Sequence, residues 1–120
     1  MKWLALCLLL PSVALAADPK KPAEPAKPAA AAPDPKVIEA GGKLFKEKTC
    51  LACHGKDAKT PILPDYPRLA GQNAAYAERQ MLDIKSGARA NGNTAAMKGI
   101  MHLVSEEEIH TLSIWLSVQP

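Results

Sequence analysis

The stretch TCLACHG, at residues 49–55, decides how this chain is to be understood. It places two cysteines and a histidine in the order C-x-x-C-H. Four kinds of site share parts of that pattern: a disulfide, a zinc site, a redox-active dithiol and a covalently attached haem. The rest of the 120-residue chain has to distinguish among them.

The first residues have the pattern of a secretory signal peptide. Lys2 supplies a positive charge, an apolar run extends from Trp3 to Leu15, and a small-x-small motif ends at Ala16. We therefore predict that residues 1–16 are removed by cleavage after Ala16. The apolar run is shorter than the roughly 20 residues that cross a bilayer. The mature chain is expected to be periplasmic and to carry no transmembrane segment.

Export also limits what the cysteines can do. Removal of the signal peptide removes Cys7, and the mature chain keeps only Cys50 and Cys53, both inside the motif. Free thiols rarely persist in an oxidising compartment. Both cysteines are therefore expected to be bonded to something.

The composition divides the mature chain into two parts. Residues 17–35 contain six prolines and no large apolar side chain, so we predict a disordered tether rich in Pro, Ala and Lys. The predicted domain, residues 36–120, has eleven Lys or Arg and nine Asp or Glu. Its net charge of about +2 is too small to indicate nucleic acid binding. It also has only four aromatic residues, and so small a domain usually needs a staple or an embedded apolar group.

Two helices have clear start or stop signals. Residues 73–86 have apolar side chains at helical spacing, with Asn73 as the predicted N-cap and Gly87 as the stop. A last helix is predicted to follow Ser105, which forms a capping box with Glu108.

A further amphipathic helix is predicted at residues 37–47, leading into the C-x-x-C-H motif. No segment alternates apolar and polar residues as a strand does. The sequence therefore predicts an all-α domain with irregular loops at residues 54–72 and 88–104.

This context distinguishes the four kinds of site. A thioredoxin-like dithiol follows a strand, and no strand is predicted. Zinc needs four ligands, and His102 and His110 lie far from any usual finger spacing. A disulfide would leave His54 without a role. A haem c accounts for the whole motif, because Cys50 and Cys53 bind its vinyl groups and His54 becomes an iron ligand.

The order of these features resembles a class I cytochrome c across residues 36–120. The stretch YPRLAGQ at 66–72, followed by Tyr76, Gln80 and SGARAN at 86–91, is similar to one half of the di-haem periplasmic cytochromes. Since only one C-x-x-C-H occurs, the resemblance implies a single-haem relative, with helices wrapped around one covalently bound haem c.

The resemblance also implies the second iron ligand. In the family this ligand lies eight residues before the serine that caps the last helix, in a pattern like M-x-G-I. Met97 with Ser105 matches that arrangement, and Met101 is its main rival. A thioether ligand raises the reduction potential of the iron. The full set of candidates is Met81, Met97, Met101, His102 and His110.

Other residues are assigned supporting roles. The resemblance implies that the Pro67 carbonyl accepts the second ring proton of the haem-ligating histidine, and that Gly71 allows chain and haem to approach closely. Arg89 is a candidate partner for a haem propionate, or else an ordinary solvated arginine. Trp115 is expected to pack against the first helix near Gly41 and Phe45.

A six-coordinate His/Met iron has no open position, so the expected function is that of an electron carrier and not of an enzyme. Two alternatives remain at this point: a haem subunit of a larger oxidoreductase, and a haem sensor with a labile methionine. The partners are expected to be redox proteins with acidic docking surfaces. The lysines expected to face them are Lys43, Lys46, Lys48, Lys56 and Lys59.

Overall fold

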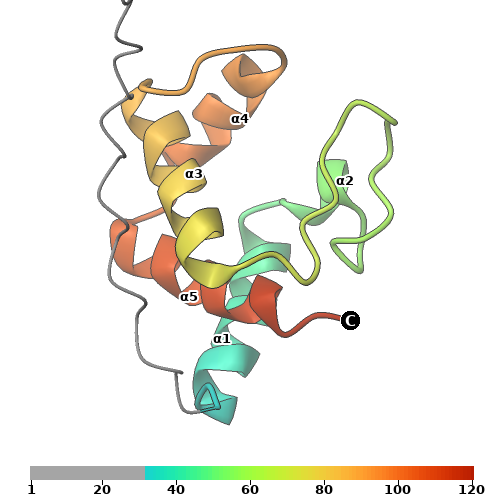
Figure 1. Cartoon of the computed structure of the whole chain (residues 1–120), viewed down its shortest axis with the longest axis vertical. Helices are drawn as coiled ribbons and strands as arrows, with labels where there is room; N and C mark the ends of the chain where they lie inside the picture. The colour runs from blue at the N-terminus through green and yellow to red at the C-terminus, as the bar shows by residue number, and fades with distance from the viewer. Residues whose placement is uncertain (1–31) are drawn as a thin grey trace, which may run out of the picture.

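The computed structural model describes residues 32–120, and every structural statement below refers to that part of the chain. The predicted signal peptide and residues 17–31 of the predicted tether lie outside the described residues. Within residues 32–120 the chain forms helices joined by loops, without a strand, which confirms the all-α prediction (Figure 1). The helices are α1 (Pro35–Glu47), α2 (Leu51–His54), α3 (Ala74–Ser86), α4 (Thr94–Met101) and α5 (Glu106–Ser117).

Helix α1 begins earlier than its apolar pattern predicts. The Asp34 carboxylate accepts a hydrogen bond from the Lys36 amide at 2.8 Å, and Pro35 stands in the first turn, where its missing N–H costs nothing. The helical part of the chain therefore includes Pro35, the last residue of the predicted tether.

Helix α5 packs against both α1 and α3, and this arrangement forms the centre of the domain (Figure 1). At the α1–α5 crossing, a Cβ added to Gly41 would lie 2.3 Å from the Cβ of Trp115. The rings of Phe45 and Trp115 are 4.7 Å apart between centroids. Both contacts confirm the predicted packing of Trp115 on the first helix. The largest fully enclosed side chains are Phe45, Met101, Val104, Ile109, Leu112 and Ser113.

The predicted ends of α3 and α5 are confirmed. The Asn73 side chain accepts a hydrogen bond from the Tyr76 amide at 3.1 Å, and Gly87 closes α3 in the left-handed conformation, with φ of 89°. At the start of α5, Ser105 and Glu108 exchange side-chain to backbone hydrogen bonds, the reciprocal pattern of a capping box.

The prediction of a loop at residues 88–104 is wrong for its second half, because residues 94–101 form helix α4. Thr94 enters this helix with its hydroxyl bonded to the Asn91 carbonyl at 2.6 Å. Met101 is enclosed in the core, and Met97 and Ile100 pack at its edge. So short a segment is helical because its apolar face packs on α3.

Residues 55–72 contain no helix, as predicted for that loop. None of the helices in residues 32–120 has the length and apolar content to cross a membrane.

Candidate haem site

The C-x-x-C-H segment forms the single turn α2 directly after α1. The amides of Cys53 and His54 both bond to the Cys50 carbonyl, at 3.2 and 3.0 Å. Residues three apart on a helical turn project from the same face. Cys50 and Cys53 are therefore placed to reach one flat group, and neither forms a disulfide.

Burial disfavours a thiolate at Cys50. It raises the pKa of the Cys50 thiol to about 11, whereas zinc sites and redox dithiols need thiolates formed at neutral pH. The described residues also contain no cluster of three or more His, Cys, Asp or Glu side chains that could hold a metal ion. The raised pKa of Cys50 and the absence of such a cluster therefore disfavour a zinc site and a redox dithiol here.

His54 is held as one tautomer. Its Nδ1 lies 3.0 Å from the Pro67 carbonyl oxygen, so Nδ1 carries the proton and donates it, as the resemblance implies. Burial lowers the pKa of His54 and outweighs the opposite effect of this hydrogen bond, so the ring is neutral near pH 7. Its Nε2 then has a free lone pair, the form that binds a metal.

The Nε2 atom of His54 also remains accessible. It has no hydrogen-bond partner among residues 32–120. Every fully enclosed side-chain nitrogen or oxygen atom of these residues does have a hydrogen-bond partner. Because Nε2 has none, it is not sealed in the core.

The loop that carries Pro67 is folded tightly onto the motif. The Asp57 carboxylate accepts bonds from the amides of Lys59 and Thr60, both at 2.9 Å, and these bonds lower its pKa to about 2. The buried Ala58 receives the amides of Leu69 and Ala70 on its carbonyl, at 2.8 and 2.9 Å. These bonds fix the loop on both sides of Pro67.

Gly71 lies beyond this loop, near the end of α5. Its amide bonds to the Leu116 carbonyl at 2.9 Å. An added Cβ would meet only the Gln119 carbonyl oxygen, at an ordinary 3.5 Å. Within the described chain, the positive φ of 74° explains why glycine stands here. Its predicted close approach to the haem stays a prediction.

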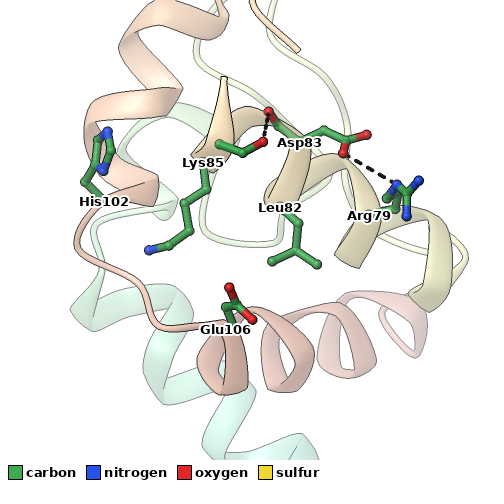
Figure 2. A pocket seen from close by; sticks show the side chains of 7 residues that line it. Arg79, Leu82, Asp83, Lys85, His102 and Glu106 are labelled. Carbon is green, nitrogen blue, oxygen red and sulfur yellow. Dashed lines mark hydrogen bonds and ion pairs between the residues drawn. The ribbon is translucent and has the colours of Figure 1, made fainter. Parts of the chain in front are cut away.

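The five candidates for the second iron ligand differ in their surroundings. Met81 and Met101 are enclosed in the core, with exposed fractions of 8% and 0%. His110 is exposed and bonds through Nδ1 to Glu78 at 2.9 Å. His102 borders an open groove between α3 and the start of α5 (Figure 2). Met97 alone among the five is a half-buried side chain at the edge of the core without a polar partner.

Arg89 has a partner that the sequence did not reveal. Its Nη1 donates to Gln80 Oε1 at 2.7 Å, and its backbone amide bonds to the Asp83 carbonyl at 2.9 Å. The guanidinium is thus held along α3. Its predicted bond to a haem propionate stays a prediction.

The predicted docking lysines are not equivalent. Lys43 pairs with Glu39 at 2.8 Å and Lys48 with Glu108 at 3.0 Å. The other three predicted docking lysines form no ion pair among residues 32–120. A docking surface would therefore depend on Lys46, Lys56 and Lys59.

A profile of the family described as cytochrome c matches residues 38–118, nearly the whole of the described domain. The chain belongs to the cytochrome c family. Members bind haem c covalently through the cysteines of this motif, and Cys50 and Cys53 have the required spacing. The class I assignment made from the sequence is confirmed.

The similarity to individual relatives supports this family assignment. The chain is 33% identical to cytochrome c4 of Azotobacter vinelandii over 98 residues, which cover 75% of this chain and 47% of the relative. It is 36% identical over 92 residues to the thiosulfate dehydrogenase electron acceptor of Stutzerimonas stutzeri, covering 77% of this chain and 41% of the relative.

The fold of the chain is also similar to that of a solved structure. The crystal structure of reduced cytochrome c4 from Pseudomonas stutzeri has a TM-score of 0.65 and 32% identity, covering 72% of this chain and 50% of that one. The chain thus spans about half the length of the relatives it matches, in agreement with the predicted similarity to one half of a longer cytochrome.

Proposed function

We propose that this cytochrome is a periplasmic one-electron carrier whose haem c iron is bound by His54 and Met97. The observation that carries the proposal is the state of His54, which directly follows Cys53 in the chain: its ring is neutral, is oriented by the Pro67 carbonyl, and has no hydrogen-bond partner at Nε2 among residues 32–120. The haem supplies the exchange of one electron between the ferrous and ferric states. With His54 and Met97 as its two protein ligands, the iron would offer no position to a substrate, and we propose no enzymatic activity.

The chain's own residues hold the group and limit its movement. Cys50 and Cys53 retain it covalently, so the carrier keeps its haem when it moves between partners. The Pro67 carbonyl stabilises one orientation of the His54 ring and makes Nε2 a stronger donor. Met97 on α4 is proposed as the second ligand, because it is the one methionine of the domain that is neither enclosed in the core nor distant from its edge.

We further propose redox proteins as partners. One relative is named as an electron acceptor of thiosulfate dehydrogenase, which supports a role in accepting electrons from another protein. Lys46, Lys56 and Lys59 are proposed to attract an acidic surface on such a partner. Export by the signal peptide and tethering through residues 17–35 complete this proposal for the periplasm.

Spectroscopy of the exported protein tests this function. Produced with a haem-attachment system, the denatured protein should stay red and weigh one haem more than the chain that begins at Ala17. The native ferric form should show the weak long-wavelength band of sulfur bound to iron, and the ferrous form should not bind CO readily. A colourless product with two free thiols would refute the proposal.

The docking surface needs a separate experiment. Electron transfer to a small acidic redox protein should slow with added salt, because salt screens the attraction between exposed charges. Replacing Lys46, Lys56 and Lys59 together by glutamine should remove most of that salt dependence. The matched control replaces Lys43, whose charge is already paired with Glu39. Equal effects in the two variants would exclude the proposed docking surface.

A further inference from the structure

Helix α4 has little support of its own. It packs against α3 and makes no comparable contact with α1 or α5 in the described part of the chain. Its N-cap, Asn93, forms no side-chain hydrogen bond with the first turn. A helix of eight residues is not stable by itself in water. Contacts from elsewhere must fix the position of α4 and of Met97 on it.

The turn that follows α4 is the place where such contacts occur. It leads from Met101 to Val104, and both of these side chains are enclosed in the core. The last carbonyls of a helix need donors from outside the helix, and positive charge is favourable at that end. The backbone itself provides three bonds here: the His102 amide bonds to the Lys98 carbonyl, and the amides of Leu103 and Val104 bond to the carbonyls three residues earlier.

Lys85 supplies a positive charge to this turn. Its Nζ donates to the Met101 carbonyl at 2.9 Å and also to the Val104 carbonyl. Figure 2 shows the side chain of Lys85 extending from α3 toward the connection between His102 and Glu106. Its ammonium group thus binds both ends of the turn at once.

Lys48 supplies a second positive charge from another part of the fold. It follows α1 and stands two residues before Cys50. Its Nζ donates to the Leu103 carbonyl at 2.9 Å and lies 3.0 Å from Glu108 Oε2. That oxygen also accepts the Ser105 amide at 2.8 Å, so Lys48 is tied to the first turn of α5 as well.

We propose that Lys48 and Lys85, called the lysine pair below, are positioning residues that hold the turn after α4 and thereby keep Met97 on the iron. The inference rests on the proposed His54/Met97 ligation. The lysine pair links three parts of the domain to one turn: the haem attachment segment, α3 and the start of α5. Loss of either lysine leaves carbonyl groups at or after the end of α4 without a charged donor, so we expect α4 and Met97 to leave their positions more often.

The test uses the haem-loaded protein with Lys48→Met, Lys85→Met or Lys85→Arg. Methionine keeps an unbranched side chain but donates no hydrogen bond, and arginine keeps the donors. The matched control is Lys36→Met, since Lys36 is exposed on α1 and its side chain has no partner among residues 32–120. Three quantities are measured: the rate of CO binding to the ferrous form, the sulfur–iron band of the ferric form, and the hydrogen exchange of the Leu103 and Val104 amides.

In either methionine variant, CO binding and amide exchange should both become about tenfold faster, because hydrogen bonds from charged donors contribute more than neutral ones. The sulfur–iron band should weaken, Lys85→Arg should restore part of each effect, and Lys36→Met should match the wild type. Should Lys85→Met fail to retain haem, Lys48→Met provides the same test through the other lysine.

The experiment distinguishes a failure of the positioning role from a failure of the ligand assignment. If the wild type shows the sulfur–iron band and the methionine variants of the lysine pair match Lys36→Met in CO binding and exchange, the lysine pair has no positioning role, even if global stability falls. If the wild type itself lacks the band, the ligand assignment under the proposed function is wrong and the role of the lysine pair toward Met97 is wrong with it.

Discussion

The Met97→Ala cytochrome is expected to lose the sulfur–iron band, to bind CO rapidly in the ferrous state and to have a lower reduction potential. A thioether stabilises the ferrous iron, and its loss opens one axial position. We expect the potential to fall by on the order of 0.1–0.3 V, within the range of about 0.8 V that axial ligands span. Optical spectra, CO binding kinetics and a redox titration measure the three effects.

Met101→Ala is the matched control, four residues along the same helix. Met101 is fully enclosed by the polypeptide, so its truncation should lower the free energy of unfolding by about 2–5 kcal/mol. The sulfur–iron band should remain, and the ferrous form should still resist CO. Opposite behaviour of the two variants would assign the ligand to Met101 and leave the carrier function intact. Rapid CO binding by the wild type would favour the sensor function instead.

Gly41→Ala should strongly lower stability at a position away from the haem site. A Cβ at this position would lie 2.3 Å from the Trp115 Cβ and 2.9 Å from the Thr111 carbonyl oxygen, and neither atom belongs to the far end of a flexible side chain. Helices α1 and α5 would have to separate. We expect the free energy of unfolding to fall by about 3 kcal/mol, and the Tm by roughly 15 °C for a domain of this size.

Ala40→Leu provides the control for Gly41→Ala. Ala40 is the preceding residue of α1 and is exposed, so a larger side chain there should change the Tm by only a few degrees. Thermal unfolding of both haem-loaded variants, followed by circular dichroism, gives the comparison. If Gly41→Ala were as stable as Ala40→Leu, the close α1–α5 crossing would be wrong.

Helix ends were predictable because their signals are local. Asn73, Gly87 and the pair Ser105 and Glu108 act on backbone groups within a few residues of themselves, so their roles can be recognised without knowledge of the fold. The contact between Gly41 and Trp115 was predictable for a different reason, since it follows from family resemblance rather than from spacing.

Helix α4 could not be predicted in the same way. Its N-cap forms no side-chain hydrogen bond, it contains Gly99, and its packing surface is supplied by α3. For the same reason, the sequence did not show that Met101 is enclosed while Met97 lies at the core edge. The roles of Lys48 and Lys85 were also hidden, because their carbonyl partners lie 55 and 16 or 19 residues away.

The burial of Cys50 has a consequence for how the protein matures. In the folded chain this thiol is only 8% exposed, and its pKa of about 11 keeps it protonated. An attachment enzyme would find neither access nor a reactive sulfur there. We therefore expect the bond to Cys50 to form before the domain folds, so that attachment precedes folding.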